Sequence, residues 1–215
     1  PQDIANYAVE TPYGPIIIKE ETSSPSLQDG IPSIDNRAIE IVLPPQLPRE
    51  LYDTLEILAA LKSAGAVSFK PGHALGLHIN YEFLPGGLGF VRDYILGFAR
   101  QDANFRQNYM LNPARAQYNH QIPEEALAVL RQTESRDVTI DTFVDYNNLL
   151  DDFSLVGGKN FAVNIEFLLP AANGAQQTGF RPAVENRLAD SSLDRSQVVA
   201  AIADMGFLDT ASSGY

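Results

Sequence analysis

Polar residues inside two apolar, strand-like segments are the best candidates for chemistry in this 215-residue chain. The first segment, AIEIVLPP, carries Glu40, and the second, GLHINYEF, carries His78, Asn80 and Glu82. Side chains in a strand alternate between its two faces, so the three polar residues of the second segment share one face. The apolar residues of that segment share the other. An imidazole, an amide and a carboxylate on one side of a sheet predict a ligand-binding surface.

The stretch FAVNIEFL repeats this pattern, with Asn164 and Glu166 on one face. Two cations flank it in the sequence: Lys159 precedes it, and Arg181 follows in GFRPAVENR. Proline cannot donate to a strand ladder, so Pro182 predicts an edge strand there. Taken singly, each of these side chains is also compatible with a purely structural role.

Turn residues, capping residues and helical periodicity in the rest of the chain predict the strands and helices that position these residues. A turn at Tyr13-Gly14-Pro15 precedes a β-branched strand, and a helix is expected from Pro48 to a C-terminal cap at Gly65. Helical periodicity recurs at residues 88–110, 123–133 and 138–152, and in a C-terminal helix capped by Ser191 or Ser192. This order predicts an α+β fold, a mostly antiparallel sheet with helices packed on one face.

We expect one domain at residues 1–190, followed by a C-terminal helix and tail at 191–215. The first residue is proline, which predicts a processed product or a fragment whose first strand is missing.

The composition of the chain disfavours or excludes several classes of function. The net charge of −12 disfavours non-specific binding to nucleic acid or to anionic membranes, which depends on lysine and arginine. No apolar run reaches the roughly 20 residues of a membrane span. The chain has no cysteine, so disulfides, thiolate nucleophiles and cysteine-ligated zinc are excluded. A cytoplasmic location is expected.

Several of these segments, in this order, carry a family pattern. EIVLPP corresponds to Glu-x-Val-x-Pro-Pro, LKSAGA to Leu-x-x-x-Gly-Ala, and GLHIN to Gly-x-His-x-Asn. The chain thereby resembles the amidoligase family, carboxylate–amine ligases with a glutamine-synthetase-like catalytic fold. KNFAVN matches a later basic-aromatic strand of that family loosely, and GFR matches its Glu-Phe-Arg strand in part, with Gly179 in place of the acid.

The resemblance implies formation of an amide or isopeptide bond through an acyl phosphate, at the expense of ATP and with Mg²⁺. It implies metal ligation by Glu40, Glu82 and Glu166, because Mg²⁺ prefers oxygen ligands. His78, Asn80 and Arg181 are the implied catalytic residues. Binding of the ATP cofactor is implied for Lys159, Asn164 and Arg181.

Two alternatives stay open at this point. A catalytically degenerate member of the fold could serve as a structural or protein-interaction component, with a protein partner or as a homo-oligomer. A metal hydrolase could use His73, His78 and His120, although no HExxH motif supports it. In the ligase hypothesis the partners are a small-molecule or peptide carboxylate and an amine.

Overall fold

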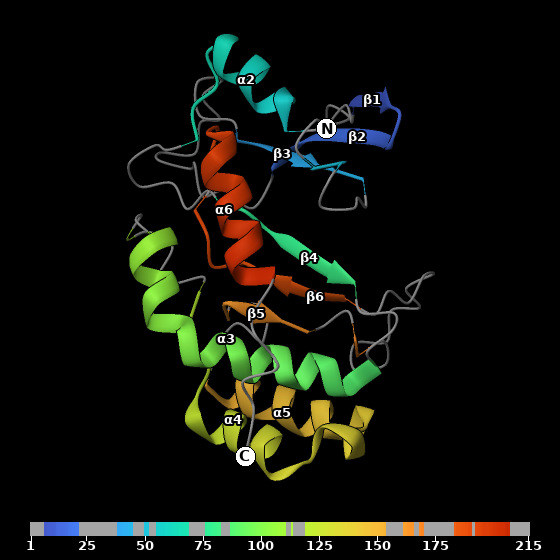
Figure 1. The fold of residues 1–215 in the computed structure, drawn as a ribbon, viewed down its shortest axis with the longest axis vertical. Coiled ribbons are helices and arrows are strands. Elements are labelled where there is room, and N and C mark those ends of the chain that lie inside the picture. Colours follow the sequence, from blue (N-terminus) through green and yellow to red (C-terminus); the bar gives the residue numbers. More distant parts are fainter. Residues whose placement is uncertain are drawn as a thin grey trace, which may run out of the picture. The chain divides into compact units, whose positions relative to one another are not determined.

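The computed structural model describes twelve parts of the chain: residues 7–21, 38–44, 50–51, 55–68, 76–82, 87–110, 113, 119–153, 161–165, 168–169, 183–190 and 192–206 (Figure 1). The chain divides into two compact units. The first comprises residues 1–75 and 191–199, and the second comprises residues 76–190 and 200–215.

The first unit contains an antiparallel sheet of strand order β1-β2-β3, with β1 at Tyr7–Thr11, β2 at Gly14–Glu21 and β3 at Ala38–Val42. The turn between β1 and β2 is closed by the Thr11 hydroxyl, which donates to the Gly14 carbonyl (2.6 Å) and accepts from the Tyr13 amide (3.2 Å). Gly14 has φ 119°, a conformation that glycine adopts without strain. Both predicted strands and the turn are confirmed.

Helix α2 spans Glu56–Ser63 in the same unit. Gly65 has φ 91°, and its amide bonds to the Lys62 carbonyl (3.1 Å), while the Ala66 amide bonds to the Leu61 carbonyl (3.0 Å). These two bonds form a Schellman motif, which satisfies carbonyls that the end of a helix leaves free. The predicted glycine cap is confirmed.

The second unit contains an antiparallel sheet of order β4-β6-β5, with β4 at Ile79–Glu82, β5 at Val163–Asn164 and β6 at Ala183–Asn186. The prediction of an edge strand after Pro182 is wrong, because β6 pairs on both sides. The strand begins at Ala183, so none of its paired residues is a proline. The predicted strand after Phe161 is shorter than expected: β5 ends at Asn164, and the Leu168 amide bonds to the Ile165 carbonyl (2.8 Å) instead of to a neighbouring strand.

The helices α3 (Gly87–Tyr109), α4 (Glu124–Gln132) and α5 (Ile140–Phe153) form where periodicity predicts them. The Thr139 and Thr142 hydroxyls accept from each other's backbone amides and cap α5. Helix α6 spans Arg195–Gly206 and is capped by Asp194 rather than by a serine. The Asp194 carboxylate accepts from the amides of residues 196 and 197, whereas the Ser192 hydroxyl accepts from the Asp194 amide.

The core of the second unit lies between its sheet and its helices. Figure 1 shows α3 lying between the sheet and the α4–α5 pair. Tyr81 of β4 stacks on Tyr94 of α3 (ring centroids 5.6 Å apart) and donates to the Ile202 carbonyl of α6 (3.0 Å). Asn186 of β6 is fully buried on this face and donates to the Tyr94 hydroxyl (3.1 Å). The described helices thus cover one face of this sheet, and the predicted α+β class is confirmed.

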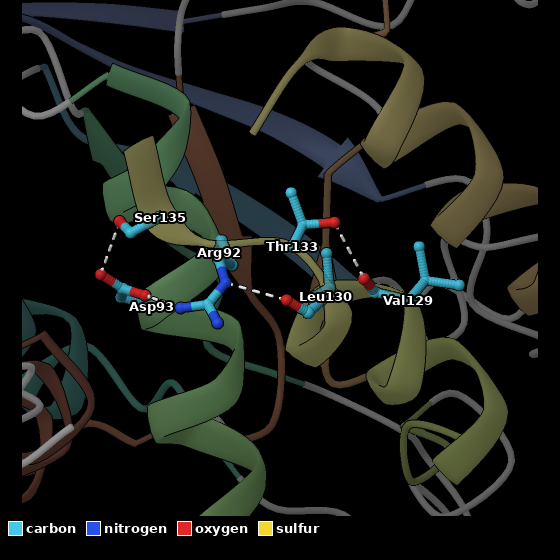
Figure 2. Close-up of polar contacts among 6 residues, drawn as sticks. All are labelled: Arg92, Asp93, Val129, Leu130, Thr133 and Ser135. Atoms are coloured by element: carbon cyan, nitrogen blue, oxygen red, sulfur yellow. Dashed lines mark hydrogen bonds and ion pairs between the residues drawn. The ribbon is translucent and has the colours of Figure 1, made fainter. Parts of the chain in front are cut away.

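A buried polar network joins α3 to the end of α4 (Figure 2). Arg92 is 5% exposed, donates from Nε to the Leu130 carbonyl (2.8 Å) and pairs with Asp93. The Asp93 carboxylate accepts from the Ser135 hydroxyl (3.0 Å), in the short helix η3 (Ser135–Asp137). A β-carbon at Gly89 would lie 2.3 Å from the Ser135 carbonyl oxygen, so this close approach requires glycine.

Candidate functional site

A row of polar side chains crosses the second sheet on the face away from α3. Glu185 of β6 is in register with Asn80 of β4 on one side and with Asn164 of β5 on the other. Residues directly opposite in an antiparallel ladder point to the same face, so these three side chains are neighbours. We call them, together with His78, the polar row.

Glu185 is the centre of the polar row. Its Oε1 lies 3.4 Å from Nδ1 of His78, and its Oε2 accepts a hydrogen bond from the Asn164 amide (2.9 Å). The Arg187 guanidinium lies 3.7 Å from Oε2. Glu185 and Asn164 are buried, whereas His78 and Asn80 are exposed. The Glu185 carboxylate therefore lies on the buried side of the polar row, whereas the His78 imidazole and the Asn80 amide are exposed to solvent.

A one-residue bulge lies beside His78. Ile79 pairs with Asn186, and Gly76 pairs with Asp190. Between these two pairs, residues 77–78 on the β4 side face residues 187–189 on the β6 side, which therefore has one extra residue. A bulge of this kind bends its strand and re-aims the neighbouring side chains. The His78 imidazole lies against the Glu185 carboxylate, although His78 itself precedes β4.

The environment of Glu185 favours its ionised form. Burial alone would raise the pKa of this carboxyl, but the hydrogen bond and charge of His78, the charge of Arg187 and the Asn164 amide together lower the pKa below its usual value. Glu185 is therefore a carboxylate at neutral pH. Both of its oxygens are already engaged by donors from the protein.

The lowered pKa makes the stability of the fold depend on pH through Glu185. A carboxyl whose folded-state pKa is depressed contributes stability above the unfolded-state pKa of about 4.3, and this is lost as pH falls through the folded-state value. We expect wild type to exceed Glu185→Gln by about 1.5–3 kcal/mol in free energy of unfolding at pH 7. The advantage should shrink from about pH 5 downward. Urea unfolding followed by circular dichroism at several pH values measures it.

The exposed Glu125 of α4 supplies the control for this experiment. Glu125→Gln should differ from wild type by under about 0.5 kcal/mol at any pH, as expected for a surface substitution. A wild-type advantage over Glu185→Gln that stays constant down to pH 3 would contradict the assignment.

The structure brings three of the predicted site residues together: His78, Asn80 and Asn164. Glu40 is half-buried on β3 of the first unit, opposite Lys19 in the register. Glu82 is the last residue of β4, opposite Ala183, but its side chain is outside the described part of the structure. Lys159, Glu166 and Arg181 also lie outside the described residues, as does His73.

The described part of the polar row does not make a metal centre. In the described parts of the chain, no group of three or more histidine, aspartate and glutamate side chains is placed to hold an ion. The only carboxylate of the row, that of Glu185, already accepts from His78 and Asn164. A Mg²⁺ ion prefers several free oxygen ligands, which this cluster does not supply.

Sequence reasoning missed Glu185 and Arg187, and the signal that could have found them is their spacing. The Glu-Phe-Arg pattern was matched to GFR at residues 179–181, where the acid is absent. Strand β6 instead carries Glu185, and Arg187 directly follows its last residue, so an acid and an arginine stand two positions apart. The Arg187 guanidinium lies 3.7 Å from the Glu185 carboxylate.

Two depressions on the described surface lie away from the polar row. One depression, of about 570 Å³, is lined by Gly87, Leu88, Gly89, Ser135, Arg136 and Val138. It includes no residue of the polar row. A search of the described helices finds none with the length and apolarity to cross a membrane.

Comparison with known proteins identifies the family. A family model described as "Putative amidoligase enzyme" matches residues 16–205, a span that includes the polar row and both sheets apart from β1 and the first two residues of β2. No curated protein and no solved structure gives a significant match. The family model covers most of the length of this chain, and the chain therefore belongs to the amidoligase family.

Proposed function

We propose that the protein is an ATP- and Mg²⁺-dependent ligase that joins a carboxylate to an amine. The carboxylate oxygen attacks the terminal phosphorus of ATP, giving an acyl phosphate and ADP. The amine then displaces phosphate and forms an amide or isopeptide bond. Membership of the amidoligase family supports the reaction class. Consumption of ATP fits a cytoplasmic setting.

The observation that carries the proposal is the polar row on a sheet face not covered by the described helices. Asn80 and His78 present exposed polar groups, and the His78 imidazole contacts the buried Glu185 carboxylate, which also accepts from the Asn164 amide. Rigid donors and acceptors on a sheet can orient two small substrates against each other, which is the main task of a ligase site.

We assign the binding of Mg²⁺ and ATP to residues outside the polar row. Glu40, Glu82 and Glu166 are the proposed oxygen ligands of Mg²⁺. Lys159 and Arg181 are the proposed partners of the phosphates, and an arginine can contact a phosphate with two hydrogen bonds.

Thermal unfolding with and without Mg·ATP tests this proposal. A ligand that binds only the folded protein stabilises it by about 2.7 kcal/mol at a hundred times its Kd, so wild type should melt at a higher temperature with Mg·ATP. Glu40→Ala should lose this shift. Glu10→Ala, an exposed glutamate on β1 of the same sheet, should keep it.

Two results would count against the proposal. Absence of a shift in wild type at millimolar Mg·ATP would reject the ligase function for this chain and favour a degenerate, non-catalytic member. A shift that survives in Glu40→Ala would place the nucleotide elsewhere and remove Glu40 from the site.

A further inference from the structure

We propose that Glu185 is a positioning residue that fixes the tautomer of His78, so that Nε2 of His78 takes a proton from the amine substrate. This inference rests on the proposed ligase function, because the amine is one of its two substrates. It assigns His78 to the amine rather than to the phosphates of ATP.

The geometry decides the tautomer. A neutral imidazole has one N–H donor and one lone-pair acceptor. Nδ1 of His78 lies 3.4 Å from the ionised carboxylate of Glu185, and two acceptors at this distance would repel each other. The proton of neutral His78 must therefore be on Nδ1. Nε2 is left with its lone pair, on a side chain that is 41% exposed.

An Nε2 lone pair suits an amine and does not suit a phosphate. Phosphate oxygens accept hydrogen bonds, so a neutral His78 held in this form offers them no donor. A primary amine, by contrast, is protonated at neutral pH and must lose a proton before it can attack. His78 can accept that proton, which is the role of a general base.

Two protons must leave the ammonium group. The first N–H bond breaks, its proton binds Nε2, and the amine keeps the electron pair with which it attacks the acyl carbon. The C–O bond to phosphate then breaks, and the departing phosphate takes the second N–H proton and leaves as hydrogen phosphate. The imidazolium that forms donates from Nδ1 to Glu185, whose negative charge stabilises it. Arg187 is the other charged group that the structure places at Glu185.

Replacing Glu185 with glutamine should reverse the tautomer. Asn164 and Arg187 both present donors to Oε2, so the amide oxygen of a glutamine should take that position. Its NH₂ group would then point at Nδ1 of His78 and require a lone pair there. We therefore expect neutral His78 to carry its proton on Nδ1 in wild type and on Nε2 in Glu185→Gln.

Nitrogen NMR of the histidine rings measures this directly. The chain has three histidines, so His78→Asn identifies the signals of His78 by their loss. His120, whose ring packs against Phe161 (centroids 5.8 Å apart), serves as the internal control and should keep its spectrum in Glu185→Gln. A wild-type His78 with its proton on Nε2 would overturn the inference, even if the variant failed to fold.

Activity with two amines tests the base role. Wild type would be assayed with Mg·ATP, the pooled proteinogenic amino acids as carboxylates, and either methylamine or hydroxylamine. Methylamine is protonated at neutral pH, whereas hydroxylamine is largely unprotonated and needs no base. His78→Asn should lower kcat with methylamine by about 10²-fold, with hydroxylamine little changed. Glu185→Gln should show the same selectivity with a smaller loss, chiefly in kcat rather than KM.

The outcomes separate the inference from the proposed function. Absence of any hydroxamate product in wild type would overturn the ligase function and the base role together. Hydroxamate formation in wild type, with equal losses for both amines in His78→Asn, would overturn the base role alone. Selective loss with methylamine, together with the Nδ1–H tautomer in wild type, would establish the inference.

Discussion

Arg92→Leu is expected to lower the free energy of unfolding by about 3 kcal/mol, because removing one partner of a buried ion pair leaves the other uncompensated. Arg92 is 5% exposed, pairs with Asp93 and donates to the Leu130 carbonyl (Figure 2). That carbonyl is in the last turn of α4 and has no partner within the helix. Urea unfolding followed by far-ultraviolet circular dichroism measures the loss.

Arg131→Gln is the matched control for Arg92→Leu. Arg131 also pairs with a carboxylate, that of Glu124, but the two side chains are 49% and 72% exposed. Water competes for such a pair, so its loss should cost under about 1 kcal/mol. Similar losses for the two variants would mean that Arg92 is not a buried structural cation.

Phe98→Ala should destabilise the protein by about 3–5 kcal/mol, the range for truncating a fully buried phenylalanine. Phe98 is 0% exposed in the core of the second unit, and its ring stacks with that of Phe105, centroids 5.4 Å apart. Alanine would leave a cavity in this core that the surrounding side chains can close only in part. The same urea titration measures the effect.

Phe153→Ala provides the comparison for Phe98→Ala. Phe153 ends α5 and is 55% exposed, so little apolar surface is returned to water when it is truncated. Its loss should cost under about 1 kcal/mol. A loss as large as that of Phe98→Ala would mean that Phe153 is covered by something in solution.

Local patterns predicted most of the elements. The helix around Phe98 has apolar residues at helical spacing, and the cap at Gly65 follows from a need for positive φ. The alternation of His78 and Asn80 with apolar neighbours correctly separated the exposed side chains from the buried Ile79. These features depend on residues close in sequence, so the sequence suffices for them.

Pairing between distant segments could not be predicted in the same way. Whether Ala183–Asn186 is an edge or a central strand depends on which strands dock on it, and Pro182 gave the wrong indication. Glu185 is linked to the site only by its register with Asn80 and Asn164. The spacing of Glu185 and Arg187 could have drawn attention to this segment, but it does not indicate which strands pair with it.

The strand order of the second unit also has a consequence for folding. Strand β6 lies about a hundred residues after β4 in the chain, and α3, α4 and α5 lie between β4 and β5. Helices form quickly because their contacts are local in sequence. Pairing between distant strands is slower, because closing the long loop between them costs conformational entropy. During synthesis the ribosome therefore releases the helical part before the central strand exists. The polar row can assemble only after β6 has been made and has inserted between β4 and β5.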